Sequence, residues 1–319
     1  MARYIGRRLA QAVLILAGVT VITFVLLHLL PGGPALALLG THKTPGAIAA
    51  LNRQLGLDRP VVIQYFVWVG SLLRGNLGFS YVHELPVTDL IRVALPNSAI
   101  IGSMAIVEAL LIAIPLGVYQ ALHPRTIGDT FATAAAFVLY SMPIFFIGAL
   151  LILFLSVHHH VFPSGGVGPV GSSASAVTRL RYALLPSLTL AFVQLAAWSR
   201  YMRSSMLDTL VQDYIRTARS KGLTMSQSVW RHGMRNALLP IIQLVGLSIA
   251  TLIGGVVVVE SVFNYPGMGY LLWQGAQQYD FPVVLGVTVI SAIAVVLGNL
   301  AADIAHAVAD PRIRDVVVE

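Results

Sequence analysis

Five basic residues gather in one short stretch of a chain that is otherwise poor in charge. Only 10% of the 319 residues are charged, yet the stretch 216–235 contains Arg216, Arg219, Lys221, Arg231 and Arg235. Arginine and lysine bind carboxylates and other anions through charge-assisted hydrogen bonds. The stretch therefore predicts a surface that docks on a partner or on the protein's own helix ends. A solvated loop that only fixes membrane topology is the alternative.

Local signals predict that this stretch begins as a short helix followed by a glycine turn. Asp213 is a predicted N-cap, and Gly222 is the residue predicted to follow the helix C-terminus. The helix between them would run from Tyr214 to Lys221, about two turns.

A second short helix is predicted after the glycine. Thr224 and Gln227 have the spacing of a capping box, the helix would carry Val229 and Trp230, and Pro240 interrupts or opens the next apolar run. Helices this short are marginal alone and persist by packing on something. Their presence favours a docked segment over a free loop.

A second group of polar residues lies at depth in apolar runs. A charged group inside a span costs about 2.5–3.5 kcal/mol on insertion scales and usually faces a bundle interior or water. The group predicts a polar translocation path; hydrogen bonding between helices or an interfacial position is the alternative. It comprises Glu108, Gln194, Gln243 and Asn299. For Glu260 and Asp303, at span ends, the alternative is favoured.

No residue set fits catalysis or a bound cofactor. The chain has no cysteine, and neither of its two lysines, Lys43 and Lys221, follows a glycine as a P-loop requires. The run His158–His160 could bind a metal, but neighbouring side chains on a helix diverge by about 100°, which favours an interfacial tract. The energy for any transport must come from another polypeptide or from an ion gradient.

The elements that position these residues are predicted to be membrane helices. The chain is 57% hydrophobic with a mean hydropathy of +0.81, and a spanning helix needs about 20 apolar residues. Six runs qualify and predict an all-α protein with six spans, at 9–30, 97–121, 131–157, 184–202, 238–259 and 283–304. Pro115, Pro143 and Pro186 are expected to bend or open their helices.

Charge predicts the orientation of these spans. About two thirds of the 20 Lys and Arg residues fall on the side of the N-terminus, which places both termini and the 200–236 loop in the cytoplasm. The chain then divides into a first span (1–30), an outer segment (31–96), a five-helix region (97–308, with a cytoplasmic loop at 208–236) and a cytoplasmic tail (309–319). Within the outer segment, the apolar run 61–73 is too short to span and predicts an interfacial or packed helix; the second outer loop, 158–183, is expected to be irregular.

The basic stretch resembles the cytoplasmic loop of ABC-importer permeases, in the form found in oligopeptide and dipeptide permeases. The matching residues read YIRTARSKGL (214–223) and RHGMRNALLP (231–240). The general pattern has Glu-Ala-Ala where this chain has Arg216-Thr217-Ala218, and the step from Gly222 to Pro240 is longer than in sugar permeases; both departures resemble the peptide branch. The resemblance implies a coupling helix docked on an ATP-binding subunit. Its implied residues are Asp213, Tyr214, Arg216, Thr217, Ala218, Arg219, Lys221, Gly222, Leu223, Arg235, Asn236 and Pro240.

Other motifs extend the resemblance over nearly the whole chain. They are the opening, which ends in LPGGP (30–34), QLGLDRPVVIQYFVWVGSLLRGNLGFS (54–80), VVVVESVFNYPGMGYLL (256–272) and DPRIR (310–314). The opening of the peptide branch usually reads Leu-Pro-Gly-Asp-Pro, and Gly33 replaces that Asp here, so any role of that carboxylate is absent.

The resemblance implies a type I ABC-importer permease in the bacterial inner membrane that carries dipeptides or oligopeptides. It implies a second homologous permease, two ATP-binding subunits that hold ATP and magnesium, and an extracytoplasmic solute-binding protein, but no nucleic acid. Members of the same branch carry nickel, haem or other small solutes, so these substrates stay open. An ion-coupled secondary transporter and a membrane-embedded enzyme are the alternatives from other classes; the first predicts internal repeats and the second a facing nucleophile and base, and neither is visible.

Overall fold

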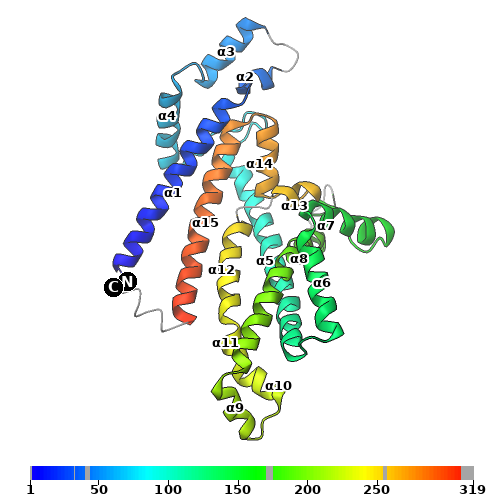
Figure 1. Cartoon of the computed structure of the whole chain (residues 1–319). Helices are drawn as coiled ribbons and strands as arrows, with labels where there is room; N and C mark the ends of the chain where they lie inside the picture. The colour runs from blue at the N-terminus through cyan, green and yellow to red at the C-terminus, as the bar shows by residue number, and fades with distance from the viewer. Residues whose placement is uncertain (1, 32, 40–43, 170–174, 254–256, 310–319) are drawn as a thin grey trace. The chain divides into compact units, whose positions relative to one another are not determined.

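The chain is built almost entirely of helices (Figure 1). The structure is a computed structural model that describes residues 2–31, 33–39, 44–169, 175–253 and 257–309. Within these residues the only β-type pairing is one isolated bridge between Phe79 and Pro86. The predicted all-α fold class is confirmed.

The helices follow one another along the chain in this order. The first part of the chain contains α1 (Ala2–Leu29), α2 (Gly33–Leu38), α3 (Pro45–Leu55), α4 (Val61–Leu73), α5 (Val87–Leu122), α6 (Ile127–Ser141), α7 (Ile144–Leu151) and the π-helical turn η1 (Ile152–His158). The second part contains α8 (Ala176–Leu210), α9 (Asp213–Ser220), α10 (Met225–Ser228), the π-helical turn η2 (Val229–Gly233), α11 (Met234–Ala237), α12 (Leu239–Ile253), α13 (Val257–Val262), α14 (Met268–Gln277) and α15 (Phe281–Ala309).

The chain forms two compact units. Unit 1 comprises Met1–Ser98, Ile253–Ser261 and Pro266–Val296, and unit 2 comprises Ala99–Leu252, Val262–Tyr265 and Leu297–Glu319. Each unit has its own apolar cores. One core of unit 1 is formed by Phe24, Leu27, Phe281, Val284 and Leu285. One core of unit 2 is formed by Val118, Ala121, Met202, Met206, Val229, Met234, Ala237 and Ile241.

Four described helices are long and apolar enough to cross a membrane. The qualifying stretches are Ala10–Leu29, Val87–Leu122, Ala176–Leu210 and Phe281–Ala301. They correspond to the predicted spans 9–30, 97–121, 184–202 and 283–304. The α8 helix is far longer than the predicted 184–202 because it continues through polar turns at both ends, and so the loop predicted as irregular to residue 183 becomes helical from Ala176.

The third predicted span, 131–157, is not one straight helix. The pair Ile127–Ser141 and Ile144–His158 is bent by 107°. Met142 has an extended backbone with ψ of 136°, and Pro143 follows it. Proline disfavours a helical conformation in the residue before it and lacks the N–H that would continue the ladder. The bend expected at Pro143 is therefore confirmed, whereas the helix assignment runs without a break through Pro115 and Pro186.

The fifth predicted span, 238–259, is not confirmed as one helix. α12 ends at Ile253, α13 starts separately at Val257, and residues 254–256 lie outside the described residues. Its described apolar part, Leu239–Ser248, is too short to qualify as a span. The count of six spans is therefore not established.

The run 61–73 folds into α4, as predicted, with Pro60 as N-cap and Arg74 as C-cap. Tyr65 and Trp68 of α4 pack against Phe24 of α1, with ring centroids 5.3 and 5.9 Å apart. The helix is therefore a packed one.

Candidate functional site

The basic segment (residues 213–240) begins with α9, whose start differs from the prediction. Gln212, with φ of −70° and ψ of 146°, is the N-cap, and Asp213 is the first helical residue. Asp213 instead faces Arg216 across 3.7 Å, and both side chains are exposed, so this ion pair contributes little stability. A carboxylate in the first turn still favours the helix N-terminus.

The glycine turn forms as predicted. Gly222 has φ of 92°, a left-handed conformation that other residues adopt only with strain. Its N–H donates to the Arg219 carbonyl at 3.0 Å, and the Leu223 N–H donates to the Ala218 carbonyl at 3.3 Å. These bonds close the C-terminus of α9.

The basic segment has two arms, α9 before the glycine turn and α10 to α11 after it. The predicted capping box forms at the start of the second arm. The Gln227 N–H donates to Thr224 Oγ1 at 3.3 Å, and the Thr224 N–H donates to Gln227 Oε1 at 3.0 Å. The helix continues through η2 and α11 to the residue before Leu238, and Pro240 sits in the first turn of α12. Pro240 thus opens the next helix, a position that proline tolerates.

One face of the segment is buried against unit 2 itself. Ile215 and Val229 are 1% and 0% exposed, and Val229 belongs to the core that includes Val118 of α5 and Met202 and Met206 of α8. The two arms are also joined directly, because Asn236 donates from Nδ2 to the Tyr214 hydroxyl at 2.8 Å. Packing rather than intrinsic propensity therefore holds these short helices.

The charged side chains of the segment are exposed. They are Arg216, Arg219, Lys221, Arg231 and Arg235. Trp230, next to Arg231 in the sequence, is 57% exposed. A hollow of about 460 Å³ at the glycine turn is lined by Arg216, Arg219, Ser220, Gly222, Leu223 and Thr224. A basic, aromatic-bearing surface on rigid helices can bind an acidic protein surface.

The four residues proposed to line a path lie in unit 2 but in different surroundings. Glu108 accepts a hydrogen bond from Ser187 Oγ at 2.8 Å, and Gln194 accepts one from Ser248 Oγ at 3.2 Å. Gln243 and Asn299 are exposed. Glu108 and Gln194 are therefore each bonded to a serine of another helix.

Glu108 retains one unusual feature. Its second oxygen, Oε2, is buried and has no hydrogen-bond partner among the described residues. A buried polar atom without a partner is costly, so such an atom often marks a functional position.

Glu260 lies in unit 1 and bonds to neighbouring helices, which is the interpretation that the sequence favoured over a place in the translocation path. It is 0% exposed, accepts from Ser98 Oγ at 2.6 Å and from the Tyr270 N–H at 2.9 Å. Ser98 Oγ in turn accepts from the Met268 N–H at 2.7 Å, which closes the start of α14. Glu260 is therefore a buried structural acceptor. The side chain of Asp303 lies outside the described residues.

His158 and His159 stack edge to face, with ring centroids 4.7 Å apart. In the described part of the chain no three side chains of the metal-binding types lie close enough to hold an ion.

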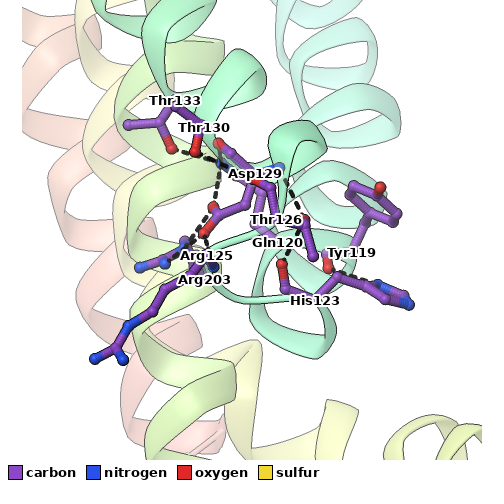
Figure 2. A network of polar contacts seen from close by, with 9 residues as sticks. All are labelled: Tyr119, Gln120, His123, Arg125, Thr126, Asp129, Thr130, Thr133 and Arg203. Atoms are coloured by element: carbon purple, nitrogen blue, oxygen red, sulfur yellow. Dashed lines mark hydrogen bonds and ion pairs between the residues drawn. The ribbon is translucent and has the colours of Figure 1, made fainter.

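Sequence reasoning missed Asp129, which is the centre of a polar network in unit 2 (Figure 2). Arg203 of α8 donates to it with Nε at 3.1 Å and Nη2 at 2.9 Å. The Arg125 N–H and Gln120 Nε2 also donate to its carboxylate, at 2.9 and 3.3 Å. The signal available was a single acid, three residues after Thr126, at the edge of an apolar run.

Two family profiles match this sequence. The profile described as "Binding-protein-dependent transport system inner membrane component" matches residues 113–315, and the corresponding N-terminal profile matches residues 1–101.

Curated relatives match along nearly their whole length. The oligopeptide transport system permease protein AppB of Bacillus subtilis is 41% identical, with 98% of this chain and 99% of the relative covered. A putative peptide permease of Brucella ovis is 38% identical over the same shares. The dipeptide transport system permease protein DppB of Escherichia coli is 34% identical over the same shares.

A solved structure shares the fold. The inward-facing MetNI methionine ABC transporter gives a TM-score of 0.57 at 18% identity, over 69% of this chain and 96% of that chain.

Proposed function

Because this chain belongs to the family of binding-protein-dependent transport system inner membrane components, we propose that it is the membrane-spanning permease subunit of an ABC importer for short peptides. The peptide specificity is supported by the relatives, which are oligopeptide and dipeptide permeases and match along nearly their whole length. A permease subunit needs no catalytic site of its own, because ATP hydrolysis takes place in partner subunits.

The basic segment is the proposed coupling surface. The observation that carries this assignment is a contrast within one segment: Ile215 and Val229 are buried in the protein, whereas the five basic side chains are exposed. A force applied to the exposed face passes into α5 and α8 through packed side chains. The coupling free energy can be no larger than the difference in affinity of the two permease states for the ATPase.

The complete importer is proposed to contain two ATP-binding subunits, a second permease and a solute-binding protein. Binding of ATP would close the ATPases and rock the membrane helices, so that peptide moves from the binding protein through a polar path that includes Glu108, Gln194, Gln243 and Asn299. The basic segment and both termini are proposed to lie in the cytoplasm, in keeping with the distribution of Lys and Arg.

The test is purification of the tagged chain in mild detergent with its co-purifying ATPase activity as readout. We expect the native chain to bring down an ATP-binding subunit and a second membrane subunit. Gly222→Pro fills a left-handed position with a residue fixed near φ of about −65°, and Arg216→Glu reverses a charge on the exposed face. Both variants should lose the ATPase while remaining folded.

Arg179→Glu is the matched control, because Arg179 is an exposed arginine outside the basic segment. It should keep the ATPase. If the native chain purifies without any ATPase, the importer assignment is wrong and transport driven by an ion gradient takes its place. If ATPase is retained by both segment variants, the coupling surface lies elsewhere.

A further inference from the structure

The Asp129 network joins three helices at one carboxylate (Figure 2). Gln120 comes from the last turn of α5, Asp129 from the first turn of α6, and Arg203 from α8. Asp129 is 5% exposed, and Arg203 forms a bidentate ion pair with both of its carboxylate oxygens. Such a pair fixes direction as well as distance, because the planar guanidinium matches the carboxylate plane.

The network also holds a strained turn between α5 and α6. Arg125 has φ of 63°, which is rare for a residue with a side chain. Its N–H donates to Asp129 Oδ2, and Thr126 Oγ1 accepts from the Asp129 N–H at 3.3 Å. Gln120 reaches across the turn and donates to Thr133 Oγ1 at 3.0 Å as well. The turn and the first turn of α6 therefore form one fixed body.

Arg203 connects this body to the basic segment. Its neighbour Met202 and the following Met206 are both 0% exposed and share a core with Val229 and Met234 of the basic segment. Seven residues after Arg203, α8 ends at Leu210, and α9 begins at Asp213. The arginine thus lies on the part of α8 that packs against the basic segment.

The Asp129 carboxylate is buried, whereas the Arg203 side chain is 32% exposed. The cost of taking the carboxylate out of water offsets part of the attraction, so the pair is weak evidence for a stabilising role. Its geometric specificity offers another role. We propose that Asp129 and Arg203 are positioning residues for transport: their pair makes the start of α6 follow every movement of α8 and the basic segment. This inference rests on the proposed function of that segment as the coupling surface.

The first measurement is a distance within the assembled importer in proteoliposomes. The chain has no cysteine, so cysteines introduced for spin labels at exposed Ile127 (α6) and Asp208 (α8) are the only ones in this subunit. In the native background the distance distribution should be the same without nucleotide and in the vanadate-trapped state. In Asp129→Asn and Arg203→Gln it should shift or broaden on trapping. A distance that changes in the native background, or stays fixed in both variants, would overturn the proposal.

The second measurement is uptake of labelled peptide per ATP hydrolysed. Allosteric coupling commonly changes an equilibrium by about fivefold to 150-fold, so we expect this ratio to fall by about fivefold or more in both variants. Arg203→Lys keeps the charge, so its ratio of uptake to hydrolysis should lie between the ratios of Arg203→Gln and the native chain. A purely structural role would lower assembly and ATPase together and leave the ratio unchanged.

The two proposals fail in different ways. If the native chain binds no ATPase, the proposed function is wrong. Normal ATPase binding in Asp129→Asn and Arg203→Gln, with an unchanged ratio and an unchanged distance, would remove only the role of the ion pair.

Discussion

The Tyr214 hydroxyl accepts a hydrogen bond from Asn236 Nδ2 across 2.8 Å, and this bond joins the two arms of the basic segment. One such bond contributes about 0.5–1.5 kcal/mol net. Tyr214→Phe should therefore make α9 open more often, and hydrogen exchange of the amides in 213–223 should quicken by about two- to twelvefold.

The control for this prediction is Tyr201→Phe on α8, since the Tyr201 side chain is 52% exposed and its hydroxyl makes no hydrogen bond within the described residues. Exchange in 213–223 should stay at the native rate in that variant. Equal exchange in Tyr214→Phe and the native chain would show that packing alone holds the arms together.

Gly117 of α5 lies in tight contact with α8. A Cβ at Gly117 would lie 2.6 Å from Met202 Cβ and 2.7 Å from the Ser199 carbonyl oxygen. Gly117→Ala should therefore push the helices apart at a cost of about 1–3 kcal/mol, seen as a lower Tm. Gly18→Ala is the matched control, because a Cβ at Gly18 meets nothing within 4 Å. Equal melting of the two variants would contradict this reading of the contact.

The buried carboxylate of Glu260 excludes a side chain at Gly267. A Cβ at Gly267 would lie 2.4 Å from Glu260 Cδ. Glu260→Ala removes the acceptor of Ser98 Oγ and of the Tyr270 N–H, so it should cost about 1–3 kcal/mol for each donor left unsatisfied. Gly267→Ala should also destabilise the protein, because the new methyl collides with the carboxylate.

A double-mutant cycle on thermal or denaturant unfolding checks this relationship. In the Glu260→Ala background the collision is absent, so Gly267→Ala should cost clearly less than it does alone. Additive losses would mean that the two residues act independently.

Tyr81, in the loop between α4 and α5, should lose its hydroxyl proton at a higher pH than an ordinary tyrosine. Burial first, and then the nearby Asp280 carboxylate, raise the pKa of Tyr81 from its usual 10.0 to about 12. Because the folded-state pKa is the higher one, the neutral hydroxyl contributes fully to stability below pH 10.0 and loses that contribution as the pH rises through about 12.

The check is tyrosinate absorbance in a pH titration, taken as the difference between the native chain and Tyr81→Phe. Asp280→Asn should lower the pKa of Tyr81 while leaving it above 10.0, since burial is the larger cause. A Tyr81 that titrates near 10.0 in the native chain would show that this loop is open to water.

Local signals predicted the parts of the site that depend on neighbouring residues. The left-handed Gly222 and the Thr224–Gln227 capping box are set by spacings of a few residues, and the break at Pro143 follows from the chemistry of proline itself. Asp213 was placed one residue wrong because Gln212, which caps with its backbone alone, carries no sequence signature. Helix ends were missed where α8 runs past its apolar stretch into polar turns.

The buried polar contacts could not be predicted in this way. Asp129 meets Arg203 from 74 positions away, and Ser98 meets Glu260 from 162 positions away. Each acid looks isolated in the sequence, and only the packing of helices supplies its donors. Glu108 was recognised as unusual because of its depth, but its partner Ser187 was not.

The bend between α6 and α7 has a consequence for the lipid around the protein. It leaves two arms, Ile127–Ser141 and Ile144–His158, at 107° to each other. An arm of 15 residues is about 22 Å long, whereas the hydrocarbon layer is about 30 Å thick. Neither arm reaches across by itself, so the pair is a broken span or a re-entrant pair, and the bilayer beside it can adapt by thinning. The length of the lipid acyl chains should therefore affect the free energy of this helix pair in the membrane, and a thinner membrane would accommodate the pair at lower cost.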